Sequence, residues 1–391
     1  MYRIGKEEAE AAARVIESGE LFRVGSKRRE VESFERDFAQ RLGVRHALLL
    51  SGGTGALAAA LVAIGIGPGD EVIVPGYTFI ATPIAVLMTG AVPVIAEVDE
   101  TLTLDPADVR RKLSAHTRAL LPVHIQGFPC DMAALAAIAK EHGLLMVEDA
   151  CQAAGGSFRG RALGSLGDAA AFSFNAQKII TAGEGGCFVT NDDEYYKRAL
   201  LYHDCGAAFW SKDAVAGTIP FAGSNLRASE ITGAVMRVQL SRLDGILADL
   251  RRVKTAISQA LTADPAFAGA QLIPSHDAAG DCGTTLGLRL PDAAQTKKLA
   301  DAVGGACPLY TERHVYTHWD AILHKQGAGT PAQNPYLLPQ NQGLQTDYAP
   351  DMCPRTLDLL GRSVYLPLHC DWDDRVIEEK VRLILNGLKS L

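Results

Sequence analysis

Apolar residues follow two kinds of pattern along the chain. In the opening stretches Lys6–Ser18 and Glu30–Leu42 they recur at helical spacing, and Gly19 and Gly43 follow these stretches, as is usual after a helix. From residue 46 onward, short continuous apolar runs alternate with helical stretches. This alternation predicts an α/β fold with a mainly parallel sheet and helices on both faces, because crossover helices join successive parallel strands.

The same patterning sets the expected limits of these elements. Strands are expected at residues 47–50, 71–75, 92–98, 120–124, 144–149, 170–174 and 187–190. Intervening helices are expected at residues 53–64, 80–88, 106–113 and 131–142. Ligands of such sheets bind beyond the carboxyl ends of the strands, so functional residues are expected there.

A long helical stretch over residues 229–261 is expected to carry the chain from one domain to another. With the boundary near Leu240, residues 1–240 form a large domain and residues 241–391 a smaller C-terminal α+β domain. Short strands at 271–274 and 284–290 and helices at 293–303 and 375–388 belong to the smaller one. Residues 327–350 are rich in Gly, Pro, Asn and Gln, which predicts a loop and suggests a cover for the site.

Composition narrows the possible functions. The chain has 391 residues, a formal net charge of -7 and a sequence pI of about 5.8, so no basic face for nucleic acid is expected. No apolar run is long enough to span a bilayer and the N-terminus lacks a signal peptide's apolar core, so we expect a cytoplasmic protein without membrane contact. The eight cysteines form no CxxC pair, which argues against a disulfide framework or a metal site of zinc spacing.

Three segments carry candidate chemistry. Leu50-Ser-Gly-Gly-Thr-Gly-Ala-Leu57 joins a strand to a helix, where glycines and free N–H groups suit a phosphate, although a tight turn alone also needs glycine. Val147-Glu-Asp-Ala-Cys-Gln152 ends a strand with carboxylates, where Asp149 either serves a ligand or caps a turn. Lys178 lies between an apolar run and a glycine-rich turn, and taken alone this stretch favours an ordinary surface lysine.

Together the three segments indicate one kind of chemistry. Pyridoxal 5'-phosphate (PLP) needs a lysine that forms a Schiff base, an acid beside the pyridine nitrogen and a cup for the phosphate. Lys178, Asp149 and the turn containing Gly53 supply this set in a single α/β domain. The combination favours a PLP enzyme over the ordinary interpretation of each segment.

Several ordered motifs occur along the chain: Gly67-Pro-Gly-Asp-Glu-Val-Ile-Val-Pro75, Thr78-Phe-Ile-Ala-Thr82, Gly90-Ala-Val-Pro93, Pro122-Val-His124, Val147-Glu-Asp149, Phe172-Ser-Phe174 with Lys178, Gly183-Glu-Gly-Gly186 and Gly223-Ser-Asn-Leu-Arg227. Through these motifs the chain resembles the DegT/DnrJ/EryC1/StrS family of PLP-dependent sugar aminotransferases over essentially its whole length. That resemblance implies PLP fold type I, the fold of aspartate aminotransferase.

The resemblance implies roles for particular residues around the cofactor ring. Lys178 forms the Schiff base and Asp149 pairs with the pyridinium nitrogen. Gln152 reaches the ring hydroxyl, and Phe79 stacks on the face of the ring. These residues belong to different motifs of the sequence, so the fold has to bring them together.

Further residues are implied for the phosphate and the substrates. Backbone N–H groups of Gly53 and Thr54 and the Ser173 hydroxyl hold the phosphate, with Asn225 contributed by a second subunit, which implies a homodimer with shared active sites. Arg227 meets a carboxylate of the amino donor or a substrate anion. The segment Tyr316-Thr-His-Trp319 partly matches the family's substrate-facing histidine region, which points to His318.

The implied reaction moves an amino group from glutamate or glutamine to a keto-sugar in a ping-pong cycle, with the cofactor alternating between PLP and pyridoxamine phosphate (PMP). Some relatives carry histidine at the lysine position and act as sugar dehydratases, and Lys178 argues against that activity. A lyase or racemase on the same fold and a PLP-binding regulator without turnover remain alternatives.

The acceptor stays open between several keto-sugars. Residues 334–341 and 351–362 resemble a subgroup that includes enzymes acting on acidic keto-sugars, such as an oxidised 3-deoxy-octulosonate. A nucleotide-linked keto-hexose and an aminocyclitol precursor fit equally well. The cationic segment Arg23-Val-Gly-Ser-Lys-Arg-Arg29 is either a solvated loop or a collar for an anionic substrate.

Overall fold

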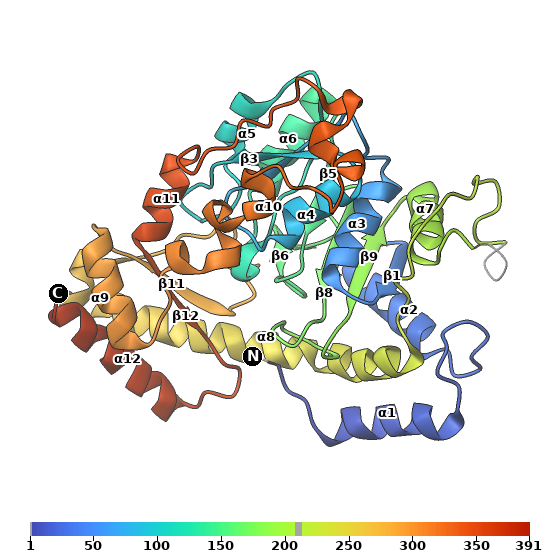
Figure 1. Cartoon of the computed structure of the whole chain (residues 1–391). Coiled ribbons are helices and arrows are strands. Elements are labelled where there is room, and N and C mark those ends of the chain that lie inside the picture. Colours follow the sequence, from blue (N-terminus) through green and yellow to red (C-terminus); the bar gives the residue numbers. More distant parts are fainter. Residues whose placement is uncertain (1, 208–212) are drawn as a thin grey trace.

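A seven-stranded sheet forms the centre of the molecule in the computed structural model, which describes residues 2–207 and 213–391 (Figure 1). The neighbouring strands, in spatial order, are β1 (His46–Leu50), β9 (Gly186–Thr190), β8 (Ala169–Ser173), β5 (Leu145–Asp149), β4 (Thr117–Leu120), β2 (Glu71–Pro75) and β3 (Val92–Ala96). β9 runs antiparallel to β1 and β8, and the other pairings are parallel. The predicted mainly parallel α/β sheet is therefore confirmed.

Alternation along β1 shows how both faces of the sheet become buried. Leu49 packs into one hydrophobic cluster, whereas Leu48 and Leu50 pack into a second cluster on the opposite face. All three side chains are fully buried. A strand that is covered on both faces has no polar alternation, which is why the expected strands appeared in the sequence as continuous apolar runs.

Helices cover both faces of this sheet (Figure 1). They are α1 (Lys6–Ser18), α2 (Glu30–Leu42), α3 (Gly53–Ala63), α4 (Ala81–Met88), α5 (Pro106–Lys112), α6 (Met132–His142) and α7 (Asp193–His203). A short hairpin of β6 (Ser157–Phe158) and β7 (Arg161–Ala162) follows β5. The predicted helices agree with these bounds to within one residue, and α7 was not anticipated, although Asp192 caps its N-terminus.

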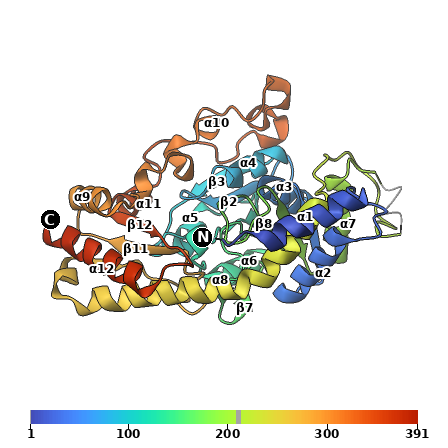
Figure 2. The same cartoon turned by 90° about the horizontal axis from the view of Figure 1, so that it is seen from below.

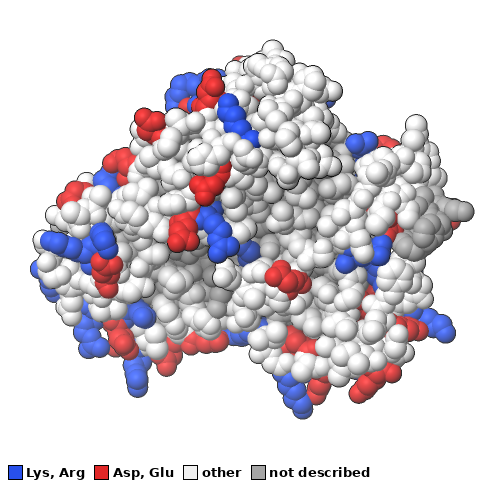
Figure 3. All heavy atoms as spheres, in the orientation of Figure 1, with Lys and Arg blue, Asp and Glu red and all other residues white. Residues whose placement is uncertain are grey.

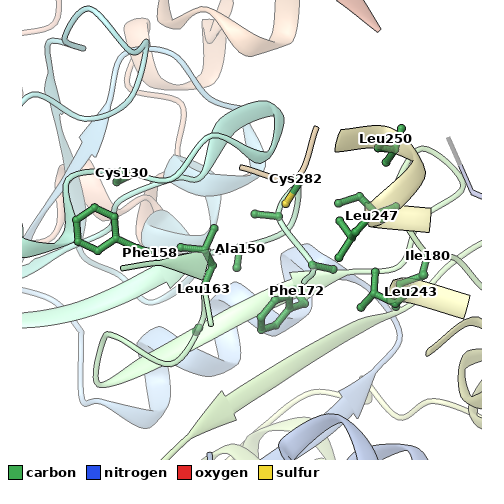
Figure 4. Close-up of a cluster of buried hydrophobic side chains, with 14 of the residues drawn as sticks. Cys130, Ala150, Phe158, Leu163, Phe172, Ile180, Leu243, Leu247, Leu250 and Cys282 are labelled. Carbon is green, nitrogen blue, oxygen red and sulfur yellow. The ribbon is translucent and has the colours of Figure 1, made fainter. Parts of the chain in front are cut away.

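The long helix α8 (Glu230–Ala263) runs beneath both parts of the molecule (Figure 2). Figure 4 shows Leu243, Leu247 and Leu250 of this helix pointing toward Phe172 of β8 and toward Cys282. Each fully buried leucine contributes roughly 1.5–3 kcal/mol of hydrophobic stabilisation. Leu240 lies inside the helix, so the predicted division there falls within one rigid element and stays a prediction.

The C-terminal part contains a second, three-stranded antiparallel sheet. Its strands are β10 (Gln271–Leu272), β11 (Thr285–Arg289) and β12 (Ser363–Pro367). Its helices are α9 (Ala293–Val303), α10 (Asp320–Leu323), α11 (Pro354–Gly361) and α12 (Asp374–Lys389). Strands and helices in this part agree with the predicted smaller α+β unit, while β12 and α11 were not anticipated.

Residues 327–350 do not cover the carboxyl ends of the strands, contrary to our expectation. They form short 3-10 turns against the opposite ends of β2 and β3. The Asn341 carboxamide accepts from the Gly69 N–H at 2.6 Å and donates to the Gly90 carbonyl at 2.8 Å, and the Tyr348 hydroxyl donates to the Pro93 carbonyl at 2.7 Å. Composition predicted the loop correctly, but these long-range hydrogen bonds decide which surface it covers.

The surface shows no dominant charge on the face drawn in Figure 3. Lys and Arg side chains lie among Asp and Glu side chains around its edge, and much of its middle is uncharged. This mixture agrees with the modest net charge of -7 and lacks the basic stripe that phosphate backbones require on that face. None of the described helices combines the length and the apolar character needed to cross a lipid bilayer.

Candidate active site

A cavity of about 550 Å³ lies at the carboxyl ends of the strands. Its walls come from the turn after β1, the segment after β2, the end of β5, the segment after β8 and residues 311–314 of the C-terminal part. Lining it are the predicted residues Gly53, Thr54, Phe79, Asp149, Gln152, Ser173 and Lys178. The fold thus brings most of the sequence-derived candidates to one place.

The turn after β1 places a helix N-terminus in the wall of this cavity. Gly52 is the N-cap of α3 and offers no side chain to occupy the free N–H groups of the first turn. A Cβ on Gly53 would lie 2.7 Å from the Ser173 Cβ, and one on Gly186 would come within 2.4 Å of the Gly52 carbonyl group. Glycine at both positions therefore lets three segments approach closely around a site suited to an anion.

Asp149 ends β5 with a buried carboxylate that faces the cavity. Its Oδ2 accepts from the Thr82 hydroxyl at 2.8 Å, and its Oδ1 accepts from the Cys151 N–H at 3.1 Å. The Thr82 hydroxyl also lies 2.8 Å from the Thr78 hydroxyl. Two hydrogen bonds thus fix the carboxylate in one orientation beside the cavity.

Lys178 enters the cavity from the turn after β8, half-buried, beside His314. Burial lowers the pKa of His314, and the nearby Lys178 charge lowers it further against an opposing hydrogen bond at Thr311. The His314 ring lies 5.4 Å from the Phe79 ring, centroid to centroid, at an angle of 52°. An imidazole that stays neutral and an aromatic face therefore stand next to the lysine.

Burial and the Asp149 charge raise the pKa of the Cys151 thiol, while Lys178 acts in the opposite direction. Cys151 lines the same cavity, so its side chain is a neutral thiol there. We assign it no chemical role.

Three predicted residues lie outside the cavity wall of this chain. Asn225 is exposed, and Arg227 forms an ion pair with Asp204. His318 is exposed, whereas His314 of the preceding 3-10 turn Glu312–His314 faces the cavity. His318 therefore lies outside the wall of the cavity in its own chain, and its role toward the substrate stays a prediction.

The cationic segment near the N-terminus is partly engaged in structure. Arg23 pairs with the Glu35 carboxylate at 3.0 Å and donates to the Leu49 carbonyl at 3.1 Å. Its side chain is 13% exposed, so the guanidinium charge is paired within the fold and is not available to a ligand. Arg23 is thus a structural residue and does not belong to a collar for an anionic substrate.

One group of potential metal ligands occurs among the described residues, away from the cavity. Ligand atoms of His369, Cys370 and Asp371 lie within 4.8 Å of one another. Asp371 also forms an ion pair with Arg3 at 2.6 Å. The arginine occupies the carboxylate that a cation would need, so this group carries no metal assignment.

The model of the DegT/DnrJ/EryC1/StrS aminotransferase family matches residues 2–384. The chain belongs to this family. The resemblance seen in the motifs is therefore confirmed across nearly the whole sequence. Aminotransferases of the family depend on PLP.

Individual relatives agree with this membership. The chain is 42% identical over 244 residues to a GDP-perosamine synthase of Caulobacter vibrioides, covering 61% of this chain and 64% of the relative. It is 44% identical over 236 residues to a dTDP-3-amino-3,4,6-trideoxy-alpha-D-glucose transaminase of Streptomyces venezuelae, covering 60% of each. The chain thus matches less than two thirds of these relatives' own lengths.

A solved structure covers more of the chain. The crystal structure of 3-amino-5-hydroxybenzoic acid synthase superimposes with a TM-score of 0.80 at 30% identity, over 100% of this chain and 98% of that one. The fold is therefore that of PLP-dependent aminotransferases, which confirms the predicted fold type I.

The residues of the cavity fit PLP by their chemistry. A helix N-terminus with a cradle that a Cβ at Gly53 would fill suits a dianionic phosphate. The fixed Asp149 carboxylate in the same wall suits a protonated ring nitrogen. Lys178 lines the same space and supplies the amine. The N–H groups at the start of α3, the Asp149 carboxylate and the Lys178 amine thus match the phosphate, the ring nitrogen and the aldehyde of PLP.

Sequence reasoning missed three residues of this site. Thr82 lies within a quoted motif, but only its position above the end of β5 shows that it orients Asp149. His314 lies four residues before the histidine that was chosen. Gln126, whose N–H donates to Gln152 at 2.9 Å, had no recognisable signal because its backbone conformation is not encoded in a motif.

Proposed function

We propose that this protein is a PLP-dependent aminotransferase that moves an amino group from glutamate or glutamine to a keto-sugar. The observation that carries the proposal is the convergence of Lys178, Asp149 and the Gly53 turn on one cavity. Family membership supports the same reaction class. PLP supplies an electron sink for the carbon that bears the migrating amino group.

Lys178 is proposed as the residue that binds the cofactor covalently and then carries protons during transfer. With PLP bound, its free amine would take the proton that leaves the donor carbon and would release it again within the cavity. The position of Lys178 in the wall of the cavity, next to the predicted cofactor contacts, supports this role. Asp149 keeps the ring nitrogen protonated through an ion pair.

The remaining contacts of the cofactor follow from the cavity walls. The N–H groups of Gly53 and Thr54, together with the Ser173 hydroxyl, bind the phosphate. Phe79 covers one face of the ring, and Gln152 donates to the ring hydroxyl. These assignments rest on the lining of the cavity and on the free N–H groups at the start of α3.

A homodimer with shared active sites is part of the proposal. Asn225 is exposed and lies on an extended segment that bridges to Asp204 and, through Arg227, to the end of β1. The segment thus sits beside the cavity's glycine turn while Asn225 stays outside its own cavity, which suits a contribution to the phosphate of a second subunit. Arg227 is proposed to orient this segment through its ion pair with Asp204.

We favour a nucleotide-linked keto-hexose as the acceptor over an oxidised 3-deoxy-octulosonate. Two relatives bear the names of enzymes that make nucleotide-linked amino sugars. The cavity rim also carries both Glu312 and Arg313, a mixed charge that does not select a small acid.

Replacement of Lys178 tests the reaction class. Wild-type protein incubated with PLP and borohydride should carry reduced cofactor on the Lys178 peptide, measured by mass spectrometry, and Lys178→Ala should carry none and lose transamination. Lys140→Ala, on the exposed surface of α6, is the matched control and should behave as wild type. An active Lys178→Ala variant would refute the proposal.

A half-reaction separates the enzyme from a PLP-binding regulator. Glutamate or glutamine alone should convert the bound cofactor to its pyridoxamine form, followed by absorbance. Keto-sugars are then screened for their ability to restore the original spectrum, with nucleotide-linked hexoses and an octulosonate tested side by side. Conversion by neither amino acid would favour the regulator, and product formed without a keto acceptor would favour a lyase.

A further inference from the structure

Gln126 occupies an unusual backbone conformation next to the cavity. In the 3-10 turn Ile125–Gly127 it has φ 53° and ψ 21°, the left-handed region that residues other than glycine and asparagine rarely adopt. Gly127, which follows it, is also left-handed at φ 78°. A non-glycine residue held in this way implies that its surroundings compensate for the strain.

The compensation comes from hydrogen bonds to two different parts of the chain. The Thr284 hydroxyl donates to the Gln126 backbone carbonyl at 2.5 Å, and the Thr285 hydroxyl donates to the Gln126 Oε1 at 3.0 Å. Both threonines are buried where the chain enters β11 of the C-terminal sheet. The C-terminal part thus holds the turn in its left-handed form.

The turn Ile125–Gly127 also fixes the side chain of Gln152. The Gln126 backbone N–H donates to the Gln152 Oε1 at 2.9 Å. A donor requires an oxygen opposite it, so the carboxamide of Gln152 can adopt only one of its two flipped orientations. Its Nε2 is left as the donor for the cavity that Gln152 lines.

A smaller cavity of about 250 Å³ adjoins the main one at this point. It is lined by Gln126, Gln152, Gln177, Lys178, Ile179, Thr284 and His314. Gln126 and Thr284 line this space together with Lys178, so the hydrogen-bonded unit that begins at β11 and the proposed reactive amine face the same space. The sequence motifs alone do not indicate that hydrogen bonds connect β11 with Gln152 through Gln126.

We propose that Gln126 is a positioning residue that, held by Thr284 and Thr285, orients the Gln152 carboxamide so that its N–H group faces the hydroxyl of the cofactor ring. The inference rests on the proposed function, because it presumes that PLP occupies the cavity. A donor at this place stabilises the deprotonated ring oxygen. Disturbing the turn therefore raises the pH at which the bound cofactor titrates.

The test compares substitutions that differ in their tolerance of the left-handed region. Gln126→Val disfavours that conformation and should displace the N–H group, whereas Gln126→Asn tolerates it and should keep the N–H group in place. The readout is the pH midpoint of the visible absorbance band of the bound cofactor. We expect Gln126→Val to raise this midpoint by about one pH unit and Gln126→Asn to leave it unchanged.

A second pair of variants shows whether Gln126 acts through Gln152. Gln152→Ala alone should raise the midpoint, and adding Gln126→Val to it should raise it no further, because residues in one hydrogen-bonded path are not additive. Additive shifts would overturn the inference. Should Gln126→Val not fold, as judged by the melting temperature without cofactor, Thr284→Val removes the bond to the Gln126 carbonyl and should shift the midpoint in the same direction.

The outcomes separate this inference from the proposed function. Wild-type protein that takes up no PLP would overturn the proposed function and, with it, the inference. A normal wild-type titration with unshifted Gln126→Val and Thr284→Val variants would overturn only the inference. A lower melting temperature without a shifted midpoint would assign Gln126 a merely structural role and would likewise overturn it.

Discussion

The Asp149 carboxylate accepts a hydrogen bond from the Thr82 hydroxyl at 2.8 Å. Thr82 belongs to α4, which follows β2, whereas Asp149 ends β5 on the other side of β4. Both side chains are buried. A residue far away in sequence thus determines where the carboxylate lies in the cavity, and this relationship leads to the first prediction.

Thr82→Val should weaken cofactor binding by about ten-fold, because the loss of one hydrogen bond to a buried carboxylate lowers the binding free energy by about 1–1.5 kcal/mol. Valine matches threonine in shape, so the packing of α4 is kept. The measurement is a fluorescence titration of cofactor-free protein with PLP. Thr82→Ser retains the hydroxyl and should bind as wild type, and an equal loss in both variants would contradict a role for the hydroxyl.

Local periodicity was enough to predict most of the large sheet. Its buried strands and crossover helices each carry their own pattern, and the helix over residues 229–261 agrees closely with α8. Strand β12 was not recognised, because its pairing partner β11 lies more than seventy residues earlier in the sequence. No turn signal joins two such distant segments, so only the assembled sheet reveals the pairing.

The same difference between local and long-range signals decides which residues of the site could be predicted. Lys178, Asp149 and the Gly53 turn are recognisable because each lies in a short motif whose chemistry is local. Thr82 and Gln126 act on other residues through hydrogen bonds across the fold, and nothing near them in sequence indicates the partner. His314 lines the cavity, whereas the predicted His318 is exposed, because the direction of a side chain in a 3-10 turn depends on the exact register.

Glu148, next to Asp149, is predicted to be a major source of stability. Its Oε1 accepts from the N–H groups of Leu166 at 2.6 Å and Gly167 at 2.7 Å. Its Oε2 accepts from the Gly164 N–H at 2.8 Å and lies 3.1 Å from the His124 Nε2. The carboxylate is fully buried, so within the described part of the chain these four groups stabilise its charge.

Glu148→Gln should lower the free energy of unfolding by about 3 kcal/mol, because its new NH₂ group faces N–H donors that it cannot accept from. Urea denaturation followed by circular dichroism measures the change. Glu141→Gln is the control: this exposed carboxylate of α6 pairs with Arg110 of α5, and its replacement should leave the midpoint unchanged. Equal midpoints for wild type and Glu148→Gln would refute the prediction.

His203 should make the fold sensitive to acid. It is 3% exposed at the end of α7, and its Nδ1 donates to the Leu200 carbonyl at 2.6 Å. Burial, reinforced by the positive charges of Arg23 and Arg227, lowers the pKa of His203 to about 3. The carboxylate of the adjacent Asp204 is engaged by Arg227, so it does not offset that effect.

The direction of the pH effect follows from this depressed pKa. Between pH of about 6.5 and about 3 the unfolded chain binds a proton at this histidine and the folded chain does not, so stability falls as the pH falls, by about 1.4 kcal/mol per pH unit. His203→Asn keeps a donor for the Leu200 carbonyl and removes the titration. Urea midpoints at pH 7 and pH 5 should therefore differ less for the variant, and equal differences would exclude His203 as the cause.

Mixed dimers test the proposed sharing of Asn225 between subunits. A dimer of one Lys178→Ala chain and one Asn225→Ala chain contains one site with both substitutions and one with neither, provided that Asn225 serves the partner's cavity. Random pairing makes half of the dimers mixed, so two inactive variants should regain about a quarter of wild-type activity after unfolding and refolding together. If Asn225 served its own cavity, every site would lack one residue and the mixture would stay inactive. Refolding each variant alone is the control, since neither should regain activity without the other.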